Sequence, residues 1–240
     1  MIKEQNEGKT DSTPDPAMID MFNAMVDEMF EYGRFILKEK RKNPANDLLS
    51  AIANAEINGE KLSDEFLDGS WLLIIFAGND TTRNTMSGGI KLLHENQEQK
   101  EMLINDLELL PNFINETVRC VSPVIHMRRT SLEETEINGQ KIGPYEKIAL
   151  WYGAANRDPS VFEDPNKFNI LRDNADKHLA FGIGRHTCIG KPIALMQLQE
   201  FYSQFLVRFQ DFEMNGDWKV APNNFVHAIQ EMPIKYSPEN

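Results

Sequence analysis

The sequence is poor in cysteine, with only Cys120 and Cys188 among 240 residues, far apart and in unlike surroundings. This scarcity excludes a disulfide framework and fits a reducing compartment, so we expect a cytoplasmic protein. Long apolar runs are missing as well, and no segment approaches the length that spans a membrane. The first residues lack the apolar core of a signal peptide. We therefore expect no membrane span.

Positive charge is also scarce. The 25 Lys and Arg are outnumbered by 37 Asp and Glu, which gives a formal net charge of −12. Such a balance argues against a nucleic-acid partner or an anionic membrane surface. The 41% hydrophobic and 26% charged residues are ordinary for a globular protein. The length suffices for one large domain or two small ones.

Periodicity predicts a mainly α-helical chain with small β-sheets, an α+β protein. Residues 1–16 are polar and read as a loose lead-in to the remainder. Helices are expected over 17–40, 47–56 and 63–94, over 96–110 with a short break, from Pro111 onward, and from the end of the cysteine loop to about residue 209. Strands are expected over 124–130 and 147–152, with a turn at Asn138-Gly139. A stripe in the first helix predicts either core or an interface; it comprises Met18, Met21, Phe22, Met25, Val26, Met29 and Phe30.

Cys188 lies in a loop of unusual composition, residues 181–190, which holds three glycines and leads into an apolar, helix-like segment. Glycine folds the backbone tightly because it adopts positive φ without strain. A cysteine just before a helix meets the positive end of the helix dipole, which stabilises a thiolate. These residues alone leave three alternatives open for Cys188: a nucleophile, a metal ligand or an inert thiol. For Cys120 we expect an inert, buried thiol.

The pattern F-x-x-G-x-H-x-C-x-G from Phe181 to Gly190, followed by Ala194, resembles the haem-thiolate loop of the cytochrome P450 superfamily. The resemblance implies haem b as the cofactor and Cys188 as the ligand of its iron, since thiolate donation favours O–O cleavage. It also places Phe181 in the cofactor-binding loop and His186 at a haem propionate. Without the motif, His186 would read as a surface histidine.

A second motif lies inside the long helix expected over 63–94. The stretch Ala77-Gly78-Asn79-Asp80-Thr81 resembles the oxygen-activating helix of the same superfamily. The resemblance implies that Ala77 and Gly78 open a widened helix over the haem. It implies that Thr81 hydrogen-bonds the oxygen and that Asp80 relays protons, as an acid and an alcohol in sequence can do. Taken alone, these residues indicate only a kinked helix with solvent-facing polar groups.

Glu116 and Arg119 form an E-x-x-R pair, which alone signals little because such pairs decorate many helices. Between the two stronger motifs it resembles the core E-x-x-R of the superfamily, with Arg172 as the third member of a buried triad. Substitution of Glu116 is then expected to abolish folding or haem retention.

The resemblance also assigns residues of the first expected strand. Arg129 corresponds to the arginine that binds a haem propionate, with Arg128 as the fallback, and a guanidinium suits a carboxylate. Val124 and Ile125 fall where the superfamily lines its substrate pocket. His126 reads either as a contact of haem or substrate or as a structural histidine.

The resemblance runs from about residue 17 to the end, whereas chains of the superfamily are nearly twice as long. We therefore expect residues 17–240 to be the C-terminal, haem-binding half of a single cytochrome P450 domain whose N-terminal half is absent. Isolated, it would leave haem and an apolar face exposed, so weak or absent haem binding is expected.

The function implied is that of a haem-thiolate monooxygenase, or a fragment of one, which hydroxylates an apolar molecule with O2. The longer motifs are similar to those of enzymes acting on long-chain alkanes, fatty acids, terpenoids or sterol side chains. Their electrons come from a ferredoxin and an NAD(P)H-dependent ferredoxin reductase, for which Lys177, Arg185 and Lys191 could form a docking patch. The alternative is a truncated or vestigial haem-binding protein without monooxygenase activity. A thiol hydrolase is a more distant third.

Overall fold

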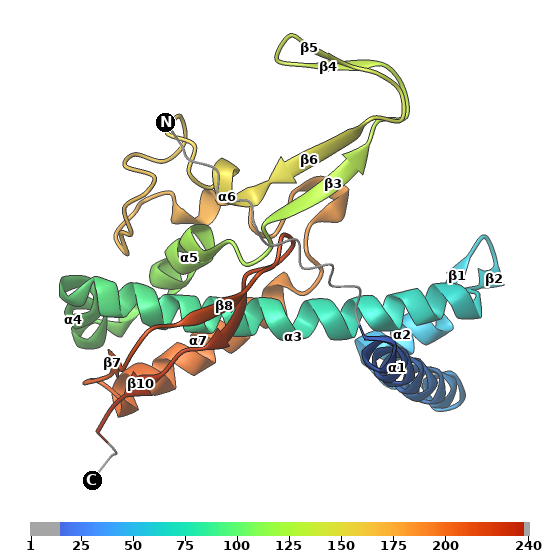
Figure 1. The fold of residues 1–240 in the computed structure, drawn as a ribbon, viewed down its shortest axis with the longest axis horizontal. Coiled ribbons are helices and arrows are strands. Elements are labelled where there is room, and N and C mark those ends of the chain that lie inside the picture. The colour runs from blue at the N-terminus through green and yellow to red at the C-terminus, as the bar shows by residue number, and fades with distance from the viewer. Residues whose placement is uncertain (1–14, 238–240) are drawn as a thin grey trace. The chain divides into compact units, whose positions relative to one another are not determined.

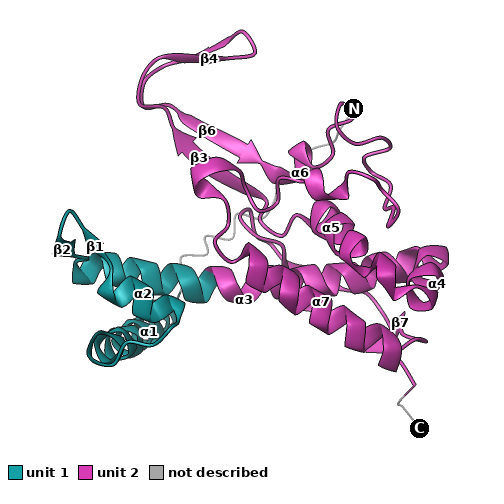
Figure 2. Ribbon diagram, turned by 180° about the vertical axis from the view of Figure 1, so that it is seen from behind, with its two compact units in different colours: residues 1–76 teal, residues 77–240 magenta. Residues whose placement is uncertain are grey.

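The computed structural model of the chain describes residues 15–237. They fall into two compact units, one ending at Phe76 and one beginning at Ala77 (Figure 2). Assignment of residues 17–240 to one domain stays a prediction. The expected polar lead-in lies outside the described residues except for Asp15, whose side chain accepts a hydrogen bond from the Ala17 amide, and Pro16, which begins the first helix.

The first unit contains α1 (Pro16–Lys42), α2 (Leu48–Asn54) and the start of α3 (Asp64–Glu95), together with a short hairpin of β1 (Glu56–Ile57) and β2 (Glu60–Lys61). The helices expected over 17–40 and 47–56 are thereby confirmed. A small core forms from buried side chains of all three helices: Leu37, Ala53, Leu67 and Trp71.

The apolar stripe on α1 is not part of that core. Met18, Met21, Phe22 and Met25 are each more than 60% exposed. The core alternative for these four side chains is therefore wrong, because helical periodicity identifies an apolar face without showing what covers it. Their role in an interface stays a prediction.

Helix α3 starts and ends where the sequence predicts. The Ser63 hydroxyl accepts a hydrogen bond from the Phe66 amide at 3.2 Å, which caps the helix. The helix stays α-helical through Ala77 and Gly78, so the expected widening is not seen. The Thr81 hydroxyl donates to the Ala77 carbonyl at 2.9 Å, a bond to the preceding turn that tends to bend a helix.

The second unit contains the rest of α3 and four further helices, with α7 beside α3 (Figure 1). These are α4 (Gln97–Asn105), α5 (Leu110–Val121), α6 (Tyr152–Ala155) and α7 (Lys191–Arg208), and three 3-10 turns are η1 (Leu107–Leu109), η2 (Ala175–Lys177) and η3 (Gly184–His186). The core lies where α3, α5 and α7 meet. Within this core the rings of Phe113 and Tyr202 pack edge to face, with their centroids 4.8 Å apart.

The strands of this unit form two-stranded antiparallel sheets. They pair as β3 (His126–Thr130) with β6 (Lys147–Trp151), β4 (Thr135–Ile137) with β5 (Gln140–Ile142), β7 (Glu213–Met214) with β10 (Ile234–Lys235), and β8 (Lys219–Ala221) with β9 (Ala228–Glu231). The predicted turn at Asn138-Gly139 closes the β4–β5 hairpin, with both residues at positive φ. The predicted class, mainly α with small sheets, is confirmed.

Two adjacent glycines allow α3 to approach α5 and α7. A Cβ added to Gly89 would lie 2.0 Å from the Tyr202 hydroxyl oxygen and 2.9 Å from Thr117 Cγ2. One added to Gly88 would lie 2.5 Å from Val121 Cγ2. The Tyr202 hydroxyl donates to the Met86 carbonyl at 2.7 Å, so it is held in place against the helix.

We expect Gly89→Ala to destabilise the second unit by about 1–3 kcal/mol, because a methyl group has no room at this contact. Urea unfolding of the chain measures the change. Gly69→Ala is the matched control, since Gly69 is also inside α3 but has no heavy atom within 4 Å of the added Cβ. That control should be neutral or stabilising by up to about 1 kcal/mol. Equal effects of the two substitutions would contradict the packing role of Gly89.

Candidate functional site

The loop around Cys188 is folded back on itself by its own backbone. The Cys188 amide donates to the Phe181 carbonyl at 2.8 Å. Gly182 and Gly184 both have φ of +69°, a conformation that side chains other than glycine's disfavour. Helix α7 begins three residues after the cysteine, and the thiol itself is exposed. The structure thus presents one free thiol at a rigid turn that enters a helix.

Three exposed isoleucines lie near Cys188 in the sequence. Ile183 is 75% exposed, Ile189 79% and Ile193 54%, and all three lie within five residues of Cys188. Exposed isoleucines on both sides of a single cysteine fit a flat, apolar group held through one thiolate. This arrangement does not resemble a site for an ion with several protein ligands. No cluster of three or more His, Cys, Asp or Glu suited to a metal ion occurs within residues 15–237.

His178 packs against Phe181, the first residue of the loop, and the sequence reasoning did not identify it. It is 7% exposed, its Nδ1 accepts a hydrogen bond from the Ala180 amide at 3.3 Å, and its ring centroid lies 5.6 Å from that of Phe181. Burial, aided by the Lys191 charge, lowers the pKa of His178 to about 4. The ring is therefore neutral near pH 7.

The two predicted propionate ligands lie on different elements. His186 is exposed at the end of η3, within the loop. Arg129 is half-buried in the middle of β3, opposite Ile148, and donates to the Arg128 carbonyl at 2.8 Å. No hydrogen bond of the described residues joins Arg129 to the loop. The structure therefore leaves its propionate role a prediction.

The predicted oxygen-activating pair lies on α3. The Asp80 carboxylate forms an ion pair with Arg83, with 2.7 Å between Oδ1 and Nη2, and its side chain is 33% exposed. Thr81 is half-buried, and Ala77 and Gly78 are exposed. Asp80 thus keeps contact with solvent, as a proton carrier requires, but one of its oxygens is engaged by Arg83. That i,i+3 spacing is a known signal for an ion pair, and the sequence reasoning did not use it.

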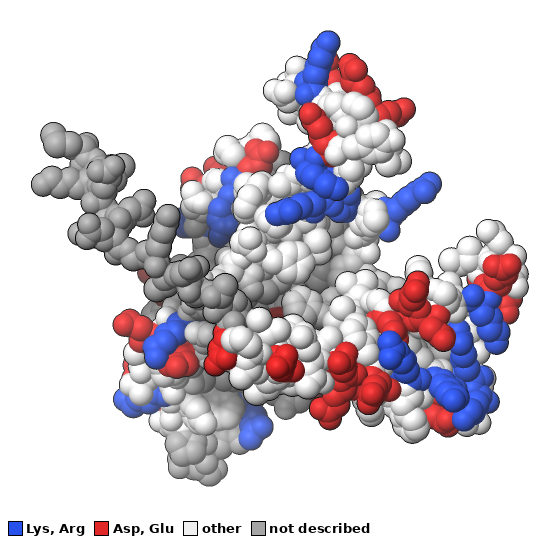
Figure 3. Space-filling model, turned by 45° about the vertical axis from the view of Figure 1, so that its right-hand side comes forward, with Lys and Arg blue, Asp and Glu red and all other residues white. Residues whose placement is uncertain are grey.

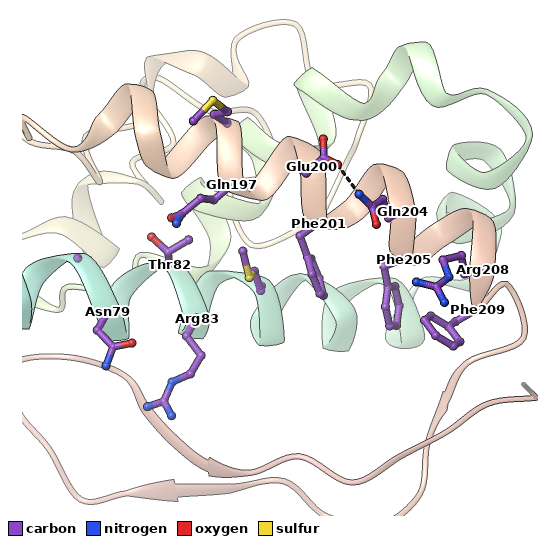
Figure 4. Close-up of a pocket in the computed structure, with 13 residues that line it drawn as sticks. Asn79, Thr82, Arg83, Gln197, Glu200, Phe201, Gln204, Phe205, Arg208 and Phe209 are labelled. Atoms are coloured by element: carbon purple, nitrogen blue, oxygen red, sulfur yellow. Dashed lines mark hydrogen bonds between the residues drawn. The ribbon is translucent and has the colours of Figure 1, made fainter. Parts of the chain in front are cut away.

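A groove of about 750 Å³ runs between α3 and α7 (Figure 4). Its side of α3 consists of Gly78, Asn79, Thr82, Arg83 and Met86, and on the α7 side Figure 4 shows Phe201, Phe205 and Phe209 in a row. At about 100° per residue, Ala77 falls on the opposite side of α3, with Asp80 and Thr81 flanking it. Among the residues predicted to contact haem or to handle oxygen, Gly78 lines the groove, whereas Ala77, Asp80 and Thr81 do not.

The predicted triad is fully assembled. Glu116 and Arg119 are 0% exposed and Arg172 is 7% exposed. Arg119 donates to both Glu116 carboxylate oxygens, at 2.7 and 2.8 Å, and Arg172 Nε donates to both at 3.1 Å. The Asn169 amide adds a further bond to Glu116, at 2.9 Å. One carboxylate thus binds α5 to the segment that precedes the cysteine loop.

The arginines of the triad also hold backbone. Arg119 donates to the carbonyls of Asn156 and Pro165, and Arg172 donates to those of Glu163 and Lys167, all within 2.9 Å. The segment from residue 156 to residue 172 has almost no regular secondary structure. Guanidinium groups replace the backbone partners that a helix or sheet would supply.

Val124 and Ile125 lead into β3 and are half-buried. The Ile125 amide donates to the Phe225 carbonyl at 2.8 Å, and Val124 forms an isolated bridge with Val226. Their backbones are fixed by this pairing. Their contact with a substrate stays a prediction.

Comparison with known proteins shows which family this chain belongs to. The family model described as cytochrome P450 matches residues 14–236. The chain belongs to the cytochrome P450 family. Membership implies haem as the cofactor, and the single exposed thiol, with exposed isoleucines near it in the sequence, fits that group.

This P450 chain is 37% identical over 210 residues to a steroid C26-monooxygenase from Mycolicibacterium smegmatis, covering 87% of this chain and 52% of that protein. It is 35% identical over 215 residues to a linalool 8-monooxygenase from Pseudomonas putida, covering 90% and 53%. The crystal structure of CYP108D1 from Novosphingobium aromaticivorans superimposes with a TM-score of 0.84 at 32% identity, covering 93% of this chain and 54% of that one. The chain spans about half the length of the curated relatives it matches.

Two further properties of the surface concern partners. None of the helices within residues 15–237 combines the length and the apolar character needed to cross a membrane. On the face drawn in Figure 3, basic and acidic side chains are interspersed. That face therefore lacks the uniform positive field with which proteins bind phosphate backbones.

Proposed function

We propose that this P450 chain is the haem-binding portion of a monooxygenase that inserts one oxygen atom of O2 into an apolar molecule. The observation that carries the proposal is the pairing of a free, exposed thiol at a rigid turn with a buried triad that fixes the preceding segment. Haem held through a thiolate supplies the activation of dioxygen. In this proposal the cofactor is haem b, with Cys188 as the iron ligand and Phe181 in the cofactor-binding loop.

The other predicted residues have supporting roles in the proposal. His186 and Arg129 would bind the two propionates by charge-assisted hydrogen bonds. Ala77 and Gly78 would let α3 approach the cofactor, because neither carries a bulky side chain. Their exposure in the described chain is consistent with a surface that a cofactor covers.

Proton delivery falls to Asp80 and Thr81. Asp80 retains solvent contact and can exchange protons once its carboxylate separates from Arg83. The Thr81 hydroxyl now donates to the Ala77 carbonyl, and a rotation about χ1 would free it to donate elsewhere. The acid would supply protons, and the alcohol would orient them.

We expect Thr81→Ala to lower the product formed per NAD(P)H consumed by about tenfold or more, with the lost electrons recovered as hydrogen peroxide. Measurement of product, peroxide and NAD(P)H consumption by a full-length version of the protein with its redox partners tests this. Thr81→Ser should retain most of the coupling, because it keeps the hydroxyl. Asn79→Ala, on the groove side of α3, should leave it unchanged. Full coupling in Thr81→Ala would contradict the role of Thr81, and a haem-loaded protein that consumes no NAD(P)H would favour a vestigial haem-binding protein.

The substrate class is proposed from the relatives and the pocket residues. The two relatives act on a steroid and on linalool, which are largely apolar molecules. Val124 and Ile125, at the expected pocket, are apolar as well. We infer a long-chain alkane or fatty acid, a terpenoid or a sterol side chain as substrate, which a binding panel of these classes against polar analogues would test.

The electron donors in this proposal are a ferredoxin and an NAD(P)H-dependent ferredoxin reductase. Lys177 precedes the loop and Arg185 lies within it, and both are exposed, while Lys191, half-buried, begins α7. These charges could attract an acidic carrier, with an association rate that falls as salt increases.

A further inference from the structure

The side chain of Asn156 connects the buried triad to the loop that carries Cys188. Asn156 is 0% exposed and ends α6. Its Oδ1 accepts a hydrogen bond from the Leu179 amide at 2.6 Å, and its Nδ2 donates to the Ser122 hydroxyl at 2.8 Å. Its backbone carbonyl accepts from Arg119 at 2.7 Å. Its backbone amide donates to the Tyr152 carbonyl at 2.8 Å. Every polar group of this residue is therefore used, and the partners outside α6 come from two segments, the end of α5 and the chain just before the cysteine loop.

The Ser122 end of this connection is rigid. Ser122 terminates α5 in the left-handed conformation, with φ of +43°, and is 1% exposed. Its hydroxyl donates to the Arg119 carbonyl at 2.9 Å, so its oxygen is left to accept from Asn156. This fixes the orientation of the Asn156 amide, because only the NH2 group can donate to Ser122 and only the oxygen can accept from Leu179.

The Leu179 end leads directly to the cysteine. The Leu179 carbonyl accepts from the Gly182 amide at 2.8 Å, and the Phe181 carbonyl accepts from the Cys188 amide at 2.8 Å. Between the end of η2 and Cys188, the Asn156 side chain holds the backbone through its hydrogen bond with the Leu179 amide. Displacement of Leu179 would therefore displace Phe181 and, through it, Cys188.

We propose that Asn156 is a positioning residue for the iron ligand, which transmits the placement of α5 and its triad to the Cys188 loop. The structural part of this inference is independent of haem, whereas its relevance to the cofactor rests on the function proposed above. Asparagine accepts from Leu179 on one side and donates to Ser122 on the other, and the Arg119 bond to its backbone carbonyl provides a second link to α5. Aspartate keeps the acceptor for Leu179 and loses the donor to Ser122, and leucine loses both at similar volume.

The test is amide hydrogen exchange of the chain without haem, followed at Leu179, Gly182 and Cys188. Asn156→Leu should exchange these amides about tenfold faster than the unsubstituted chain, as expected for loss of a buried hydrogen bond. Asn156→Asp should keep them within about twofold. Ser122→Ala is the matched control, because it removes the Nδ2 partner and leaves the Leu179 bond intact, so the loop amides should again stay within about twofold.

Unchanged loop exchange in a folded Asn156→Leu variant would overturn the inference. If that variant does not fold, Asn156→Ala decides, because it also removes both side-chain bonds: accelerated exchange of the loop amides supports the inference, and unchanged exchange overturns it. In a full-length version of the protein loaded with haem, the loosened variant should also lose intensity in the absorption band of the carbon monoxide complex of thiolate-ligated haem. Absence of that band in the unsubstituted full-length protein would count against the proposed function alone, since the exchange result does not involve haem.

Discussion

Glu116→Gln is expected to cost about 3–5 kcal/mol of unfolding free energy, because it leaves two buried guanidinium groups without their counter-charge. The glutamine amide keeps one acceptor oxygen and turns a donor group toward Arg119 or Arg172, which have only donors to offer. The Asn169 amide also competes for the remaining oxygen. Such a loss is of the same size as the total stability of many domains.

Urea unfolding of the chain, followed by circular dichroism, measures this change. The matched control is Glu39→Gln, since Glu39 also forms an i,i+3 ion pair, with Lys42 at 2.8 Å, but both side chains are more than 40% exposed. An exposed pair of this kind contributes about 0–1 kcal/mol. If Glu116→Gln cost no more than Glu39→Gln, the buried network would not hold the segment before the cysteine loop.

The sequence predicts best those features whose cause is local. Ser63 caps α3 through an amide three residues away, and Asn138-Gly139 adopts the positive φ that such a pair favours in a hairpin. The triad was predictable for a different reason, since its members were recognised from a family pattern. The spacing of Glu116 and Arg119 alone could not show that both would be completely buried.

Features that depend on distant segments could not be predicted. The neighbours of Gly89 are Thr117 and Tyr202, which come from α5 and α7, so the sequence around the glycine carries no sign of its packing role. The same holds for Asn156, whose partners lie 34 and 23 residues away on opposite sides of it in the chain. The donors and acceptors of a side chain show its role only after the fold has brought their hydrogen-bond partners within reach.

The apolar stripe of α1 shows the converse limit. Its periodicity predicts the helix and the apolar face, and both are present. Periodicity does not distinguish a face covered within the chain from one that needs a partner, because both have the same residue pattern. The widening expected at Ala77-Gly78 is not seen, and the backbone remains α-helical there, because glycine permits an irregular turn without imposing one.

Cys188→Ser is expected to abolish the spectrum of thiolate-ligated haem in the protein. A serine hydroxyl remains protonated near neutral pH and donates far less electron density to iron than a thiolate does. The loss of haem affinity should exceed the roughly 100-fold that removal of an outer partner of a metal ligand costs. Haem titration with carbon monoxide difference spectra measures both effects.

Cys120→Ser is the matched control for this substitution. Burial and the adjacent Glu116 carboxylate raise the pKa of the Cys120 thiol to about 11, so it stays protonated and cannot replace the missing ligand. Its removal should leave the haem spectrum unchanged, whereas a spectrum retained in Cys188→Ser would show that the iron is held elsewhere. Because the two thiols differ in exposure, the pair of variants separates ligation by a specific sulfur from a general effect of losing a cysteine.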